Sequence, residues 1–125
     1  MAGENIADGR WSKTKKNCIL NSRGKGTKLL AEYFANSNQK PRLIISASAV
    51  GFYGDRGAEI VDEDSKAGNG FLANVCVKWE DALKVAAKAG IRVIKVRFGT
   101  VLSKRGCCCR SNWCSAVFSV AWSNI

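Results

Sequence analysis

A short apolar run constrains the fold of this chain more than any other feature. Leu43–Ala47 consists almost entirely of apolar and small residues, which is typical of a strand covered on both faces in a parallel sheet. Ile91–Phe98 alternates apolar and basic residues and predicts a second strand. Because a helical segment separates the two strands, the layout is that of a crossover connection. The sequence therefore predicts an α/β fold in which helices flank a parallel sheet.

Two segments have the spacing of helices. The first runs from Lys13 to about Asn36, and Ser12 is a suitable N-cap for it. Its apolar side chains are expected to share one face: Ile19, Leu30, Tyr33 and Phe34. The second, Phe71–Ala89, has apolar residues at three- and four-residue steps, and Gly90 is expected to end it. Residues 55–70 are polar and rich in glycine, which predicts a surface loop.

Composition narrows the classes of function. At 125 residues the chain is expected to hold one domain at most. Its net charge of +10 suits either a nucleic-acid-binding module or an ordinary basic surface, and the scattered charges favour the surface. The absence of histidine excludes Ser-His-Asp and Cys-His nucleophilic machinery. No apolar run approaches the ~20 residues of a membrane span and no signal layout is present, so we expect a cytoplasmic or organellar soluble compartment with reduced thiols.

Four strings carry a family resemblance: A-G-E-N-I-A-D-G-R-W, S-A-S-A-V-G-F-Y-G-D-R-G, F-L-A-N-V-C-V-K-W-E and R-F-G-T-V-L-S. Together, from Ala2 to about Gly106, they resemble the atypical short-chain dehydrogenase/reductases described as NAD(P)-dependent sugar-nucleotide epimerases. The resemblance implies a Rossmann-type fold, an NAD(P) cofactor, a nucleotide-sugar-like substrate and hydride transfer. It also places Ala2 and Gly3 at the end of a strand close to the cofactor ribose.

The resemblance implies specific site residues around S-A-S-A-V-G-F-Y-G. Ser48 corresponds to the serine that hydrogen-bonds the reacting oxygen, and Tyr53 offers a phenol in the same turn. Gly99, Thr100 and Val101 correspond to the turn that binds the nicotinamide amide. The alternative is that S-A-S-A only permits close packing of a strand against a helix.

The chain departs from the family pattern in three ways. No G-x-G-x-x-G or G-x-x-G-x-x-G follows a strand, so we expect the N-terminal nucleotide-binding half to be lacking, with weak or no NAD(P) binding and no activity of the chain alone. In addition, the Tyr-x-x-x-Lys pair of the superfamily aligns with Leu72 and Cys76, which cannot perform its acid–base role. Arg23 stands where related reductases often carry asparagine, and the sequence assigns it no role.

The tail after Gly106 contains four crowded cysteines, at positions 107, 108, 109 and 114. A metal site is one interpretation, but three adjacent cysteines are a poor arrangement for a tetrahedral ion. The other is that a shifted reading frame or an intron encodes the tail. We expect residues 1–106 to form a partial Rossmann-like domain, 107–125 to lie outside the fold, no metal to bind, and uncovered sheet edges to permit self-association.

Overall fold

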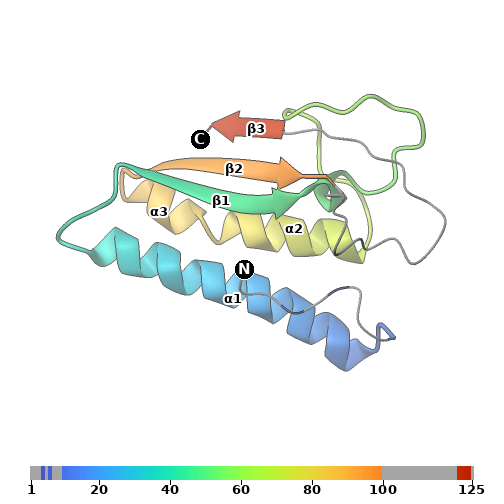
Figure 1. The fold of residues 1–125 in the computed structure, drawn as a ribbon, viewed down its shortest axis with the longest axis horizontal. Coiled ribbons are helices and arrows are strands. Elements are labelled where there is room, and N and C mark those ends of the chain that lie inside the picture. Colours follow the sequence, from blue (N-terminus) through green and yellow to red (C-terminus); the bar gives the residue numbers. More distant parts are fainter. Residues whose placement is uncertain (1–3, 5, 7–9, 100–120, 125) are drawn as a thin grey trace, which may run out of the picture.

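The computed structural model describes Glu4, Ile6, residues 10–99 and the backbone of residues 121–124. Three helices lie along one face of a small sheet (Figure 1). The elements, in chain order, are α1 (Lys13–Asn36), β1 (Leu43–Ala49), the 3-10 helix η1 (Val50–Tyr53), α2 (Phe71–Asp81), α3 (Lys84–Lys88), β2 (Arg92–Phe98) and β3 (Ala121–Asn124).

β1 and β2 are parallel, as predicted. Their register runs from Leu43 opposite Arg92 to Ala49 opposite Phe98, so both strands end at the same edge of the sheet. The loop predicted over residues 55–70 connects η1 to α2, and the crossover through α2 and α3 leads back to β2. The α/β prediction is confirmed.

α1 begins where the sequence predicts, because the Lys15 amide donates to Ser12 Oγ at 3.2 Å. The prediction of its buried face was partly wrong. Ile19 is buried, but Leu30 and Tyr33 are 58% and 68% exposed. The contacting face rotates along the helix, since α1 packs on α2 in one part and on α3 in another. Ala31, instead of Leu30, therefore enters the core near α3.

The second predicted helix is divided in two. The amide of Leu83 donates to the carbonyl of Glu80, three residues earlier, so the turn tightens between α2 and α3. This tightening keeps Leu83 in the core, where it is 4% exposed. Gly90 follows α3 with φ = +84°, a left-handed conformation that suits glycine and ends the helix as predicted.

The apolar core lies where the strands begin. Its buried members come from α1, the α2–α3 connection, α3 and the start of β2: Ala31, Leu83, Ala86, Ile91 and Val93. The opposite face of the sheet presents apolar side chains to solvent, with Leu43, Ile45 and Phe98 exposed by 40%, 65% and 46%. Among the described residues, no helix is long and apolar enough to cross a membrane.

The sheet has a third strand that the sequence did not predict. The backbone of Ala121–Asn124 pairs antiparallel with β2, and Lys95 lies opposite Ser123. The outer edge of β2 offers the backbone groups for this pairing, in a tail that the sequence analysis expected to lie outside the fold. The cysteines at 107, 108, 109 and 114 lie outside the described residues, and the boundary at 106 stays a prediction.

Candidate functional site

A buried polar cluster lies between the sheet and the helices, at the edge of the sheet where β1 and β2 end. Ser48 comes from β1, Arg97 from β2 and Glu80 from α2, and each is at most 5% exposed. Arg97 donates from Nε to Glu80 Oε1 and from Nη2 to Glu80 Oε2, both at 2.9 Å. Ser48 Oγ donates to Glu80 Oε1 at 2.7 Å. The two-pronged contact fixes the carboxylate between the sheet and α2.

The electrostatics of the cluster favour an ionised Glu80. Burial by itself would raise the pKa of this carboxyl, but the hydrogen bonds from Arg97 and Ser48 outweigh burial and hold the pKa below its ordinary value. Burial likewise opposes the charge of Arg97, yet its bonds to Glu80 and Tyr53 raise its pKa. Lys95 Nζ stands 3.8 Å from Glu80 Oε2, and burial lowers the pKa of Lys95 despite that carboxylate. One carboxylate thus faces two cations.

Ser48 uses its only hydroxyl hydrogen within this cluster. An ionised carboxylate accepts hydrogen bonds and donates none, so the hydrogen between Ser48 and Glu80 belongs to the serine. In this arrangement Ser48 has lone pairs to offer and no hydrogen left to donate. This differs from the donor role that the family resemblance implies for it.

Tyr53 joins the cluster through Arg97. Arg97 Nη1 donates to Tyr53 Oη at 2.9 Å and to the carbonyl of Glu63 at 3.3 Å, which ties the 55–70 loop to the sheet. The guanidinium also lies 3.6 Å from the centroid of the Phe52 ring. Arg97 therefore connects β2, α2, η1 and the loop.

The loop closes tightly against η1 at Gly68. The amide of Gly68 donates to the carbonyl of Phe52 at 2.9 Å. A Cβ at position 68 would stand 1.9 Å from the carbonyl oxygen of Tyr53, so no residue larger than glycine fits without a backbone shift. This close approach fixes the rim of the adjoining cleft.

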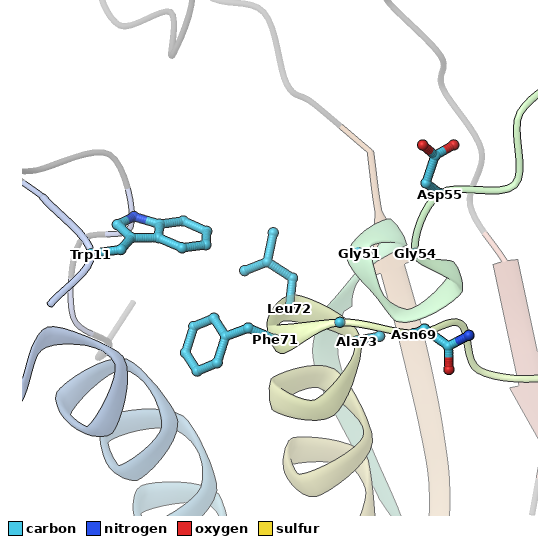
Figure 2. Close-up of a pocket in the computed structure, with 9 residues that line it drawn as sticks. Trp11, Gly51, Gly54, Asp55, Asn69, Phe71, Leu72 and Ala73 are labelled. Carbon is cyan, nitrogen blue, oxygen red and sulfur yellow. The ribbon is translucent and has the colours of Figure 1, made fainter. Parts of the chain in front are cut away.

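An open cleft of about 320 Å³ lies beyond the end of β1, beside the first turn of α2. In Figure 2, Trp11 and Phe71 border it on one side, with Leu72 between them and the η1 turn. Trp11 and Phe71 meet edge to face, with ring centroids 5.7 Å apart. Three glycines, two short polar residues and an alanine form the rest of the wall: Gly51, Gly54, Gly70, Asp55, Asn69 and Ala73. The cleft is thus apolar at one side and polar at the other.

The positions that align with the Tyr-x-x-x-Lys pair lie at and behind this cleft. Leu72 lines it, while Cys76 is 5% exposed and packs behind Gly51, 3.8 Å from the place of a Cβ there. Burial, followed by the charge of Glu80, raises the pKa of the Cys76 thiol. The thiol is therefore protonated at neutral pH and is not an activated nucleophile.

The structure brings together some of the predicted site residues. Ser48 bonds Glu80 and Tyr53 bonds Arg97, so the Glu80–Arg97 ion pair connects them, but both are buried and neither lines the cleft. Gly99 is half-buried just after β2. The predicted cofactor contacts Ala2, Gly3, Thr100 and Val101 lie outside the described residues. Within residues 10–99, no group of three or more His, Cys, Asp or Glu side chains is arranged to hold a metal ion.

Sequence reasoning missed the buried ionic cluster that Glu80, Lys95 and Arg97 form. The alternation in β2 was visible, and it suggests that the basic side chains face solvent. Instead, Val93, Lys95 and Arg97 face the helices, because Glu80 on α2 supplies the countercharge there. One signal in the sequence could have predicted this ion pairing. Glu80 is an acidic residue within the apolar helix, and the strand that follows carries basic residues at alternate positions.

Comparison with known proteins points to one family. No protein-family model matches the chain. An epimerase family protein of Mycobacterium bovis is 42% identical over 106 residues, which are 85% of this chain and 35% of that protein. A chloroplastic epimerase family protein of Arabidopsis thaliana is 40% identical over 100 residues, covering 78% of this chain and 28% of its own length.

Two solved structures are also similar. A nucleoside-diphosphate sugar epimerase from Corynebacterium glutamicum shares 50% identity with a TM-score of 0.70, over 79% of this chain and 22% of its own. Human epimerase family protein SDR39U1, solved with NADPH, shares 34% identity with a TM-score of 0.77, over 85% of this chain and 37% of its own. The chain thus spans about a third of the length of the curated relatives first compared. Its sequence and its partial Rossmann-type fold place it in the epimerase family of the short-chain dehydrogenase/reductases.

Proposed function

We propose that this chain supplies the substrate-side wall of an NAD(P)-dependent epimerase-family site. The observation that carries the proposal is the cleft of about 320 Å³ at the carboxyl end of β1. In open α/β sheets, ligands bind outside the carboxyl ends of the strands. The human relative that was solved with NADPH supports an NAD(P) cofactor for the family. A nucleotide-sugar-like substrate is proposed on the name of the Corynebacterium relative.

The lining of the cleft suits the nicotinamide end of the cofactor together with part of a substrate. Trp11 and Phe71 offer flat apolar surfaces against which a ring can pack. Gly51 and Gly70 let a ligand approach the backbone closely. The N-cap of α2 is Gly70, which has no side chain to bond the first amides of the helix, so a ligand oxygen can accept from them. When bound, NAD(P) supplies the hydride acceptor or donor.

The fit covers only one end of the cofactor. The sequence contains no glycine-rich turn between a strand and a helix to bind the pyrophosphate. Leu72 and Cys76 provide no general acid or base at the edge of the cleft. We therefore propose that the chain alone binds NAD(P) weakly or not at all and is inactive.

Ser48 and Tyr53 have a positioning role in this proposal. Ser48 is oriented by Glu80, and Tyr53 by Arg97, so together they fix the end of β1 and the η1 turn. If a substrate reaches Ser48, it must donate a hydrogen to it, as an alcohol does and a carbonyl does not. The site would then favour the alcohol form of the substrate.

The test uses a chimaeric protein and then a substitution that fills the cleft in that chimaera. The matched 106 residues would replace their counterparts in the Mycobacterium bovis relative, and NADPH binding would be measured by fluorescence. We expect the transplant to bind NADPH and Gly51→Phe within it to weaken binding, because the new ring fills the cleft. Gly24→Phe is the matched control, since a Cβ at position 24 meets nothing within 4 Å. Equal effects of the two substitutions would contradict the cleft assignment.

The 125-residue chain itself tests the second part of the proposal. We expect no saturable NADPH binding at micromolar concentrations. A dissociation constant in the micromolar range would show that the missing glycine-rich turn is not needed, and would overturn the proposal of an inactive, weakly binding chain.

A further inference from the structure

A second hollow lies between the helices and shares no lining residue with the cleft at the end of β1. It is a groove of about 370 Å³ between the middle of α1 and the stretch that joins α2 to α3. A Cβ at Gly24, one of its lining residues, would meet nothing within 4 Å, so a side chain from outside has room to enter there. Apolar side chains and lysines form most of this lysine groove: Leu20, Ala82, Val85, Lys25, Lys28 and Lys78.

Two of these lysines have no ion-pair partner in the part of the chain that the structure describes. They are Lys25 and Lys78, and both are exposed. Lys28 pairs with Glu32 at 3.6 Å. Asp81, the acidic residue of the lining, is engaged by a lysine of α3 at 2.7 Å. The groove therefore combines apolar side chains with two positive charges that lack a countercharge.

The loop after η1 has the complementary chemistry. Residues 59–64 read Glu-Ile-Val-Asp-Glu-Asp, and we call them the acidic loop. Ile60 is 96% exposed, the highest value among the exposed large apolar side chains of the described residues. The carboxylates of Glu63 and Asp64 are also exposed, and neither forms an ion pair with any residue that the structure describes. An apolar side chain and two uncompensated negative charges are thus presented together.

The acidic loop and the lysine groove of one molecule lie apart. In Figure 1 the loop, drawn in green, projects on the side of the sheet away from α1, which forms one wall of the groove. The loop is held there, because Arg97 donates to the carbonyl of Glu63 at 3.3 Å and the Gly68 amide donates to the carbonyl of Phe52 at 2.9 Å. The loop can therefore reach a lysine groove only on another molecule.

We propose that the acidic loop of one copy of this chain docks into the lysine groove of a second copy. Ile60 enters the apolar part of the groove at Gly24, and the two loop carboxylates face the two lysines that lack a partner. A two-fold contact between two lysine grooves is disfavoured, because lysine would then face lysine. A six-residue loop covers less area than a stable dimer interface needs, so the association is weak.

The experiment measures the molar mass of the full chain by sedimentation equilibrium. Weak association calls for protein concentrations up to about 0.5 mM. At low salt we expect a mass above that of one chain, rising with concentration. At about 0.5 M salt, where exposed charges are screened, the mass should fall toward that of one chain.

Reversed charges test the pairing itself. A loop variant carries Glu63→Lys with Asp64→Lys, and a groove variant carries Lys25→Glu with Lys78→Glu. Each variant should weaken association at least about tenfold, because like charges then meet. The chain with all four substitutions should associate again, since its loop and its groove have exchanged charges.

Two further variants complete the design. Lys13→Glu with Lys88→Glu is the matched control, because both lysines are exposed, lie outside the groove and change the net charge by as much as the groove variant does. This control should associate as the unaltered chain does. Ile60→Ser should weaken association without altering the fold, since the side chain is 96% exposed. It keeps the test decisive if a charge variant fails to fold.

Recovery in the chain with all four substitutions supports the proposal, and three results overturn it. The first is a single-chain mass for the unaltered protein at every concentration. The second is association that survives the charge reversals and Ile60→Ser, as pairing of uncovered sheet edges would. The third is an equal loss in the control, which would make net charge alone responsible.

Discussion

The layer between the sheet and the helices has two unlike ends. Where the strands begin, Leu83, Ala86 and Val93 form an apolar core. Where the strands end, Ser48, Glu80 and Arg97 form a hydrogen-bonded ionic cluster of comparable burial. In Figure 1 the first end lies beside α3 and the second beside α2. The two ends are thus buried to a similar degree, one by apolar side chains and the other by paired charges.

The difference separates stability from positioning. Apolar contacts are non-directional and tolerate small shifts, whereas a two-pronged ion pair holds each group in one orientation. The directional end is the one beside the cleft, where the position of η1 and of the 55–70 loop sets the shape of the wall. A buried ion pair is not in itself strong evidence for stability, so its value here is the fixed geometry.

The largest expected effect is at Glu80. Glu80→Ala leaves Arg97 and Lys95 buried without their carboxylate, and we expect a loss of about 3–5 kcal/mol in the free energy of unfolding. Urea denaturation of the two proteins measures the difference. A loss below about 1 kcal/mol would mean that water reaches the guanidinium and that the cluster is not a closed unit.

The same residue makes the ionic end sensitive to acid. Since the folded-state pKa of Glu80 lies below its value in the unfolded chain, its contribution is present above about pH 4.3 and is lost as the pH falls through the folded-state pKa. Glu80→Gln removes this titration, so its stability should fall less steeply with acid than that of the unaltered chain. Parallel acid profiles for the two proteins would contradict the assignment.

The apolar end is expected to respond to volume instead of pH. Leu83→Ala removes a side chain that is 4% exposed and should lower the free energy of unfolding by about 2–5 kcal/mol, through lost burial and the cavity left behind. Val85→Ala, at a neighbouring position that is 37% exposed, is the control and should cost much less. The acid profile of Leu83→Ala should parallel that of the unaltered chain. A changed profile would show that the two ends are coupled.

The sequence predicted the elements well because their local signals agree with the tertiary contacts. Ser12 caps α1, Gly90 ends α3, and the run at Leu43 forms a strand. The faces of the elements were harder to predict. Leu30 is exposed and Ala31 buried, because the neighbour of α1 changes from α2 to α3 along its length. Only the arrangement of three helices decides which side is covered.

The contacts of the predicted site residues were beyond the reach of the sequence. Ser48 bonds Glu80, and Tyr53 bonds Arg97, a residue 44 positions after it, so the ion pair between Glu80 and Arg97 connects the two. Neither spacing nor composition indicates such a contact. The orientation of the Ser48 hydroxyl depends on Glu80, which the sequence placed only as a helix residue. Their catalytic role stays a prediction.

A smaller effect is expected at Ser48. Ser48→Ala removes one hydrogen bond to a charged group and should cost about 1.5–3 kcal/mol in the free energy of unfolding. Ser46→Ala is the matched control on the same strand, where the hydroxyl donates only to the neighbouring carbonyl of Ala47 at 3.3 Å. Chemical denaturation of both variants measures the difference. Equal losses would show that the bond from Ser48 to Glu80 adds nothing to the ion pair.

The smallest expected effect is at Ser12, and it acts on both ends at once. Ser12→Ala removes the cap of α1 and should lower the free energy of unfolding by about 1 kcal/mol, whereas Ser12→Asp restores an acceptor. Because α1 covers α2 at one end of the layer and α3 at the other, amide exchange should accelerate first in the opening turn of α1, beside Trp11 and the cleft. Acceleration around Ala31 alone would contradict this order, since that residue lies in the apolar core, far along the helix from the lost cap.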